Sequence, residues 1–223
     1  MVGAVRDLCG VRLHDWIVFD PESLVGEEIR VPDKYEGVRV RLEARLAEAR
    51  IPVQVDVGFG DAIVPEPSRE AFPTLLDHPE PRILVYPREA VVAEKLEAMV
   101  SLGVTNSSMK DFYDVHRLAA RFPFDGATLV RAVRATFGRR GTGLPEAAPL
   151  VLAPGFLAAP ERQTQGRAFL RRSRLEGPHD AALLVEVLRT FLVPVLEAAS
   201  QGRSFDAHWP PGPWVPARKE ALP

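Results

Sequence analysis

A lysine within the apolar stripe of an amphipathic segment is the first candidate for chemistry in this 223-residue chain. Lys95 shares one face of a predicted helix with apolar neighbours, namely Val91, Val92, Leu96, Met99 and Val100. Two interpretations are open. The stem can run along the surface so that the ammonium group reaches water. Alternatively, the ammonium group points toward a carboxylate or a phosphate, because a mobile point charge suits phosphate oxygens.

Two carboxylates, Asp111 and Asp114, follow on the next predicted helix. Residues three apart share one helical face, and Lys110 lies four residues before Asp114, about one helical turn away. The group can be a solvated face with an ordinary Lys110–Asp114 pair. The alternative is that some of these charges are buried or paired, because Phe112 and Tyr113 indicate a packed helix.

A third candidate, Asp56, lies on a predicted strand, on the face opposite to its apolar neighbours, and the segment Gly58-Phe59-Gly60-Asp61 follows it. Glycines near a strand carboxylate let a ligand or another backbone approach closely. A carboxylate at a strand end is a natural magnesium ligand, and phosphoryl transfer requires magnesium. Most aspartates on edge strands have no catalytic role, so Asp56 alone does not define a site.

Several other chemistries are disfavoured by the motifs that the sequence lacks. The five histidines show no metal-ligand spacing, and Cys9 is the only cysteine, which excludes an internal disulfide and any cysteine-rich zinc site. No phosphate-binding GxxxxGK[ST] loop, GxGxxG turn or GxSxG elbow occurs.

The composition is that of a soluble globular protein with one or two domains: 46% of the residues are apolar, 26% are charged and the formal net charge is −2. A chain of this length buries enough surface to need no disulfide or metal for its core. No apolar run is long enough to span a membrane, and no basic and apolar leader follows Met1. We therefore expect a cytoplasmic location.

The spacing of the apolar residues predicts which elements position the candidate residues, and this spacing changes along the chain. Helical spacing over residues 1–10 predicts a helix, and residues 15–31 predict short strands and turns. Period-two alternation over residues 38–46 and 51–57 predicts an antiparallel hairpin. A helix over residues 41–50 is the alternative, because those residue types favour helix.

From residue 87 the pattern becomes helical. Helices are predicted over residues 87–103, from a cap at Asn106 or Ser107 to Arg121, from a cap at Asp125 to about Phe137, and over residues 161–172 and 179–200. The last residues, rich in proline, read as a surface or disordered tail. The fold class is therefore α+β, with a small mixed or antiparallel sheet region at 1–86, a helical half at 87–200 and a tail at 201–223.

Two strings of this sequence resemble the AbiEii/AbiGii-type toxin family of nucleotidyltransferases: RVRLEARLAEARIPVQVDVGFGDAI and YPREAVVAEKLEAMVSLGVTNSSMKDFYDVHRLA. The resemblance implies the polymerase-beta-like nucleotidyltransferase fold and a toxin of bacterial toxin–antitoxin or phage-defence pairs. It also implies magnesium-dependent transfer of a nucleotide from a nucleoside triphosphate to an acceptor such as tRNA. Asp56 would match a metal-binding carboxylate, Lys95 (with Lys110 nearby) the residue that holds the triphosphate, and Asp111 or Asp114 a downstream catalytic carboxylate.

The sequence departs from that family where the metals would be held. Members carry a Gly-Ser turn and an Asp-x-Asp strand upstream, and this chain contains neither. Because two-metal catalysis needs a symmetric clamp on the attacking and leaving oxygens, we expect an incomplete metal site and an inactive chain. We also expect self-association through a sheet edge in the N-terminal half.

Two other classes of function compete with the enzyme. One is a non-catalytic remnant that docks a cognate antitoxin. The other is a plain nucleic-acid binder that uses the arginines of the C-terminal half, although such helix surfaces are usually only solvated. Those arginines are Arg131, Arg134, Arg139, Arg140, Arg171, Arg172 and Arg174.

Overall fold

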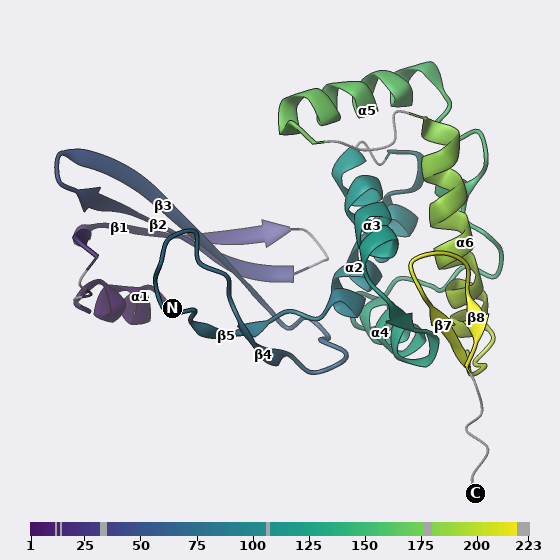
Figure 1. Cartoon of the computed structure of the whole chain (residues 1–223), viewed down its shortest axis with the longest axis horizontal. Helices are drawn as coiled ribbons and strands as arrows, with labels where there is room; N and C mark the ends of the chain where they lie inside the picture. Colours follow the sequence, from purple (N-terminus) through teal and green to yellow (C-terminus); the bar gives the residue numbers. More distant parts are fainter. Residues whose placement is uncertain (12, 14, 32–34, 106–107, 176–179, 218–223) are drawn as a thin grey trace, which may run out of the picture. The chain divides into compact units, whose positions relative to one another are not determined.

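The computed structural model divides into two compact units, Met1–Asp61 and Ala62–Pro223, and each is described by itself (Figure 1). It describes residues 1–217 except residues 12, 14, 32–34, 106–107 and 176–179. The unit boundary places residues 62–86, which the sequence grouped with the sheet region, with the helices. Within the described residues, no helix has the length and apolar character needed to cross a bilayer.

The first unit is an antiparallel three-stranded sheet with one short helix. Its elements are α1 (Val2–Cys9), β1 (Ile17–Val31), β2 (Tyr35–Leu46) and β3 (Ala49–Phe59), and the strand order is β1-β2-β3. The predicted helix and hairpin are confirmed, and the alternative helix over residues 41–50 is wrong. The short strands and turns expected over residues 15–31 are instead one long strand, whose register shifts between Asp20 and Val25.

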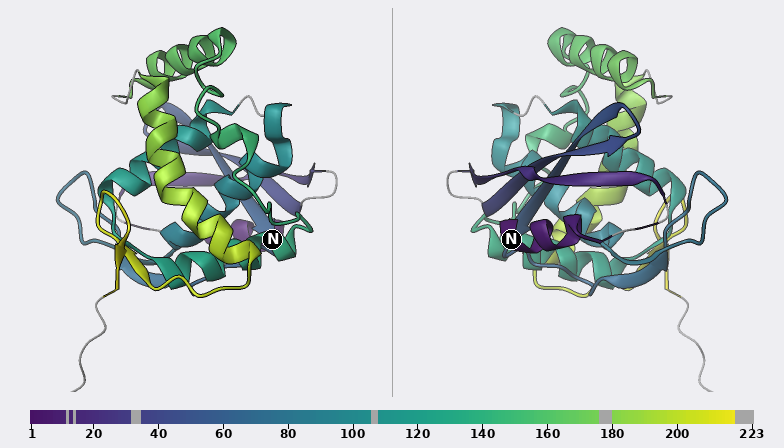
Figure 2. Two further views of the ribbon diagram at one scale, coloured as in Figure 1. Left: turned by 90° about the vertical axis from the view of Figure 1, so that its right-hand side faces the viewer. Right: turned by 90° about the vertical axis from the view of Figure 1, so that its left-hand side faces the viewer.

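Period-two alternation gives this sheet one apolar and one polar face. Helix α1 lies against the apolar face (Figure 2), where a small core forms from Cys9, Leu24, Val40 and Leu42. Gly26 makes the close approach possible, because a Cβ atom there would clash with the Val2 side chain. The opposite face of β2 and β3 therefore carries the charged residues.

The second unit is mostly helical. A hairpin of β4 (Ser68–Ala71) and β5 (Arg82–Val85) precedes the helices α2 (Arg88–Leu102), α3 (Met109–Arg121), α4 (Gly126–Arg139), α5 (Pro160–Ser173) and α6 (Ala181–Ser200), with 3-10 turns η1 (Gly103–Thr105) and η2 (Leu150–Leu152). All five predicted helices are present, and with the antiparallel sheets they confirm the α+β class.

The helix starts follow local capping chemistry where the chain supplies it. Asp125 caps α4 as predicted, since its carboxylate accepts a hydrogen bond from the Thr128 backbone N–H at 2.8 Å. Asn106 and Ser107 lie outside the described residues, and Ser108 is the N-cap position of α3. One continuous core, which includes Phe112 and Phe191, joins α2, α3, α4 and α6.

The segment after α6 was predicted to be a surface or disordered tail, and the structure corrects this prediction. Residues Ala207–Trp209 (β7) pair with Phe124–Asp125 (β6) and with Val215–Pro216 (β8) in a small antiparallel sheet. Trp209 is buried, and its indole N–H donates to the Ala119 carbonyl at 2.8 Å. Burial of a large aromatic ring, and not backbone propensity, therefore fixes this segment on the helices.

Candidate active site

Lys95 lies between two carboxylates of the neighbouring helix. Its Nζ atom is 2.9 Å from Asp111 Oδ1 and 2.8 Å from Asp114 Oδ2, so α2 supplies the cation and α3 both anions. The side chains of Lys95, Asp111 and Asp114 are 17%, 18% and 33% exposed. The interpretation that Lys95 meets carboxylates is confirmed, and the snorkelling interpretation is wrong.

The local sequence explains how these three groups meet. Asp111 and Asp114 project from one face of α3 because they are three residues apart. Asp111 also lies in the first turn of α3, where the partial positive charge of the helix end favours a carboxylate. Three of the apolar neighbours of Lys95, namely Val92, Leu96 and Met99, are buried on the same side of α2, which holds the lysine stem against the core.

The carboxylates keep the lysine charged. Burial alone would lower the pKa of Lys95, but its hydrogen bonds with Asp114 and Asp111 outweigh burial and raise that pKa above the usual 10.5. A lysine ammonium has three N–H donors. Among the described residues the two carboxylates take two of them. One donor is therefore left for another acceptor, such as a phosphate oxygen.

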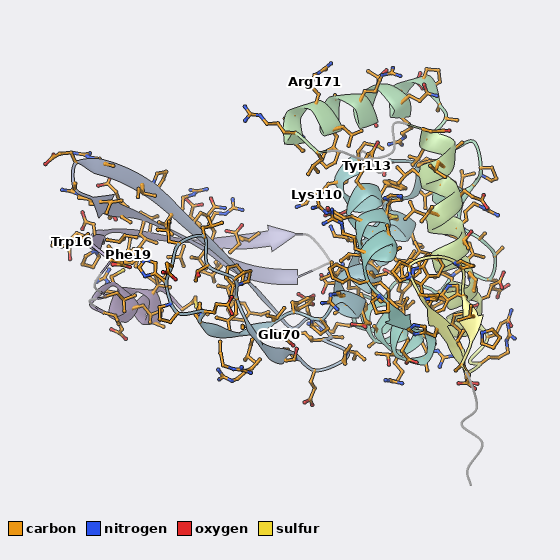
Figure 3. All side chains as sticks on the ribbon, viewed as in Figure 1. Trp16, Phe19, Glu70, Lys110, Tyr113 and Arg171 are labelled. Carbon is orange, nitrogen blue, oxygen red and sulfur yellow. The ribbon has the colours of Figure 1, made fainter. Side chains whose placement is uncertain are left out.

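Lys110, labelled in Figure 3, lies outside this cluster. Its side chain is exposed, and Asp114, its predicted partner, is bound by Lys95 instead. Within the part of the chain that the structure describes, no ion pair joins Lys110 to Asp114. The ordinary pair expected for a solvated face is therefore not what this helix forms.

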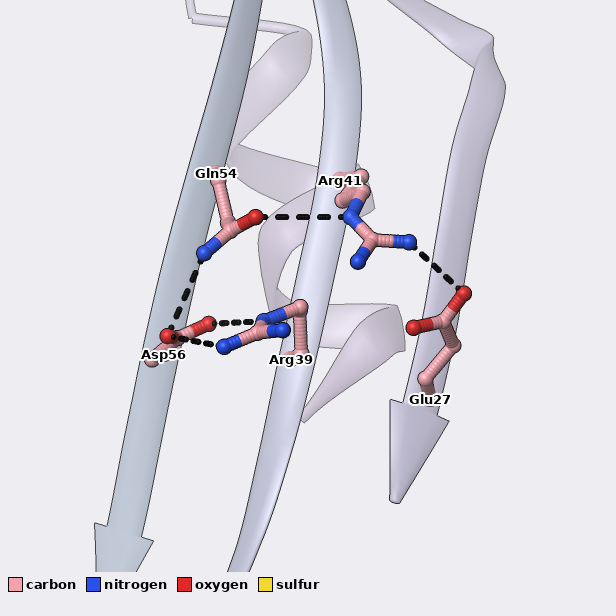
Figure 4. Close-up of polar contacts among 5 residues, drawn as sticks. All are labelled: Glu27, Arg39, Arg41, Gln54 and Asp56. Atoms are coloured by element: carbon pink, nitrogen blue, oxygen red, sulfur yellow. Dashed lines mark hydrogen bonds and ion pairs between the residues drawn. The ribbon is translucent and has the colours of Figure 1, made fainter. Parts of the chain in front are cut away.

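Asp56 belongs to the sheet unit and has a cation of its own (Figure 4). Its two oxygens accept hydrogen bonds from Arg39 at 2.7 and 2.8 Å, and Oδ2 also accepts one from Gln54 at 3.2 Å. Arg39 is directly opposite Asp56 on β2, so the pair is a cross-strand ion pair. The bond from Arg39 is the main cause that lowers the pKa of Asp56 below its usual 3.8.

The described residues do not fit a two-metal centre. No group of three or more histidine, cysteine or acidic side chains that could hold a metal ion occurs among them. Asp56 is engaged by Arg39, while Asp111 and Asp114 share the ammonium group of Lys95. A magnesium site needs several free oxygen ligands around one point, and these carboxylates are already bound to cations.

A buried ion pair that the sequence analysis missed supports α2 from its other side. Glu97 is fully buried, and its carboxylate accepts hydrogen bonds from Arg140 at 2.9 Å and from Thr142 at 2.6 Å. Arg140 also lies 3.5 Å from Glu94. These contacts tie α2 to the end of α4, so they hold the helix that carries Lys95. Nothing in the local pattern distinguishes Glu97 from the other glutamates of α2.

A cavity in the helical unit was not predicted from the sequence. The cavity has a volume of about 340 Å³ and is lined by His116, Glu186, Thr190, Trp209 and the loop at residues 211–213, among others. Burial lowers the pKa of His116 below its usual 6.5. Because His116 and Trp209 are far apart in the sequence, only the folded chain reveals this cavity.

The chain is an α+β protein, and its helical unit holds a half-buried lysine between two carboxylates. The model of the family described as nucleotidyl transferase AbiEii toxin, type IV toxin–antitoxin system, matches residues 3–197. The chain belongs to this family. A toxin of this kind has an antitoxin as its counterpart. No match was found among curated proteins or among solved structures.

Proposed function

We propose that the helical unit is the nucleotide-binding part of a nucleotidyltransferase toxin, and that Lys95 binds the triphosphate of a nucleoside triphosphate. In an active member of the family, the acceptor of the nucleotide would be a nucleic acid such as tRNA. The observation that supports this proposal is the half-buried Lys95 ammonium held between Asp111 and Asp114. A point charge at a defined position with one donor to spare suits a phosphate oxygen.

The two carboxylates have different parts in this proposal. Asp111, the less exposed, anchors the lysine, and Asp114, the more exposed, is the partner that yields when a phosphate arrives. Together the three groups carry a formal net charge of −1, which disfavours a bare triphosphate. We therefore expect binding to depend on magnesium, whose positive charge offsets the charge of the phosphates. Lys110, which is exposed on α3 beside the two aspartates, is a second cation that would bind the phosphates.

Asp56 is the proposed metal ligand of the sheet unit, and it serves only if Arg39 moves away. Because the sequence has no Asp-x-Asp pair and the described carboxylates are engaged by cations, we propose that this chain binds nucleotide but does not transfer it. Binding and transfer must therefore be measured separately.

Calorimetric titration with a nucleoside triphosphate, with and without magnesium, tests binding. We expect Lys95→Ala to weaken affinity at least ~10-fold, which is about 1.4 kcal/mol. Lys95→Arg should restore little of the affinity, because a planar guanidinium group does not fit a site shaped for a compact ammonium group. Arg117→Ala, which removes an exposed cation from α3, is the matched control and should bind normally. Unchanged affinity in Lys95→Ala would contradict the proposed role.

Incubation of the same protein with labelled nucleoside triphosphates, magnesium and total tRNA tests transfer. We expect no labelled product. Labelling above background that disappears in Asp56→Ala would overturn the proposal of inactivity and would assign Asp56 to catalysis.

A further inference from the structure

The two outer strands of the β1–β3 sheet differ in how they are protected against pairing. Strand β1 contains Pro21 and a register shift between Asp20 and Val25, and it carries Glu27 and Glu28. Prolines, irregularities and charges are the devices by which proteins block an exposed strand edge. Among the described residues β3 has β2 as its only partner strand, and its stretch from Val53 to Phe59 contains no proline and no irregularity.

The single charge in that stretch does not block pairing either. Asp56 is neutralised by two hydrogen bonds from Arg39 on the polar face of the sheet. The alternate side chains form an apolar row on the other face, and several of them are substantially exposed: Ile51, Val55 and Phe59. Of the two edges, β3 is therefore the one that is open to another strand.

The hairpin geometry shows which backbone groups point outward. Only Ala47 and Glu48 connect the two strands, so the flanking pair Leu46↔Ala49 is the hydrogen-bonded pair that closes the turn. Because the register continues without a shift, the even-numbered residues of β3 are non-hydrogen-bonded to β2 and direct their N–H and C=O groups to the open edge. Pro52, which has no N–H, is tolerated because it is one of these even-numbered residues and so owes no hydrogen bond to β2.

We propose that β3 pairs in antiparallel fashion with β3 of a second copy of this chain, about a two-fold axis at Val55. In this register Gln54 is opposite Asp56 of the second copy, so an amide meets a carboxylate and no like charges face each other. The apolar row also matches itself, as Val53 meets Val57 and Ile51 meets Phe59. The β3 edge is therefore complementary to a second copy of itself, as a two-fold interface requires.

The contact is short, which sets its expected strength. Gln54, Asp56 and Gly58 offer outward N–H groups, so two copies form about six backbone hydrogen bonds. An interface of this size is at the low end for specific association. We therefore expect a reversible dimer whose population rises with protein concentration, in place of a permanent one.

Sedimentation velocity over a concentration series measures the association. We expect Val55→Lys to raise the dissociation constant at least ~10-fold, because two ammonium groups would then meet at the axis. Val18→Lys is the matched control, since Val18 is on the other outer strand and is 43% exposed, against 40% for Val55. It should leave the association unchanged. Mixing Val55→Lys with Val55→Glu should restore a dimer through opposite charges at the axis.

Cross-linking tests the register without relying on a charged variant. Val55→Cys should form an intermolecular disulfide under mild oxidation, because the two Cα atoms at a non-hydrogen-bonded pair are about 4.5 Å apart, within the range that a disulfide spans. Val57→Cys should not, since it faces residue 53. The unaltered chain, whose single Cys9 is buried, is the background control.

A monomer at every concentration, an unaffected dimer in Val55→Lys, or equal cross-linking at residues 55 and 57 would each overturn the proposal.

Discussion

The sheet unit and the helical unit each contain an ion pair, and the two pairs are buried to different depths. Arg39 and Asp56 are 33% and 42% exposed on an open sheet face, whereas Lys95 and Asp111 are 17% and 18% exposed between two helices. Water therefore screens the first pair more strongly than the second. We therefore expect the ion pair of the sheet unit to have a small effect on stability and that of the helical unit to have a larger one.

A third pair extends this comparison to full burial. Glu97 has no exposed surface, and its partner Arg140 is 12% exposed. A buried pair contributes little net stability by itself, but removing one partner leaves an uncompensated charge. The three pairs thus form a series in which the penalty for breaking the pair should follow burial.

The largest effect is expected at Glu97. Glu97→Ala removes the buried carboxylate of Arg140 and leaves the partly exposed Glu94, at 3.5 Å, as a weaker counter-charge, so we expect a loss of about 3 kcal/mol in the free energy of unfolding. Urea denaturation followed by circular dichroism measures it. Glu161→Ala, an exposed glutamate of α5, is the control and should change stability little. A loss at Glu97 no larger than that of the control would contradict the ordering by burial.

An intermediate effect is expected at Lys95. Lys95→Met keeps the apolar stem and leaves Asp111 and Asp114 without their cation, so we expect a loss of about 1–3 kcal/mol at neutral pH. Adding Asp111→Asn to this variant should recover part of the loss.

The pH dependence sharpens the test at Lys95. Since the folded-state pKa of Lys95 is raised above 10.5, the pair's contribution is complete below pH 10.5 and is lost as the pH rises through the folded-state pKa. The stability difference between the wild type and Lys95→Met should therefore stay constant from neutral pH to 10.5 and shrink above it. A difference that grows above pH 10.5 would contradict the assignment.

The smallest effect is expected in the sheet unit. Asp56→Asn and Arg39→Ala each break a solvent-exposed cross-strand pair. We expect both variants to melt within experimental error of the wild type at physiological salt. A clear destabilisation by either would mean that the pair is buried in solution, and exposure would then no longer explain the contrast between the two units.

Local pattern predicted most of the elements that carry the site. The hairpin follows from period-two alternation, and the helices of Lys95 and of Asp111 and Asp114 follow from helical spacing. The long strand over residues 17–31 was predicted as shorter strands and turns, because Asp20-Pro21 and Val25-Gly26 are residue pairs typical of turns. Pairing with β2 overrides that local preference.

The tail shows a second limit of local pattern. Strands of two or three residues have no period to detect, so β7 and β8 carried no signal. Contact with α3 and β6, through the buried Trp209, gives them their structure.

By itself the sequence determined the α+β class, the face of α2 that carries Lys95 and the shared face of Asp111 and Asp114, because these depend only on residue type and spacing. Only the tertiary structure determined which charges lie in contact. Lys95 forms ion pairs with Asp111 and Asp114, Asp56 forms one with Arg39, and Glu97 is buried against Arg140. The partner of a charge depends on the crossing of helices and the register of strands, and those are fixed only when the whole core packs.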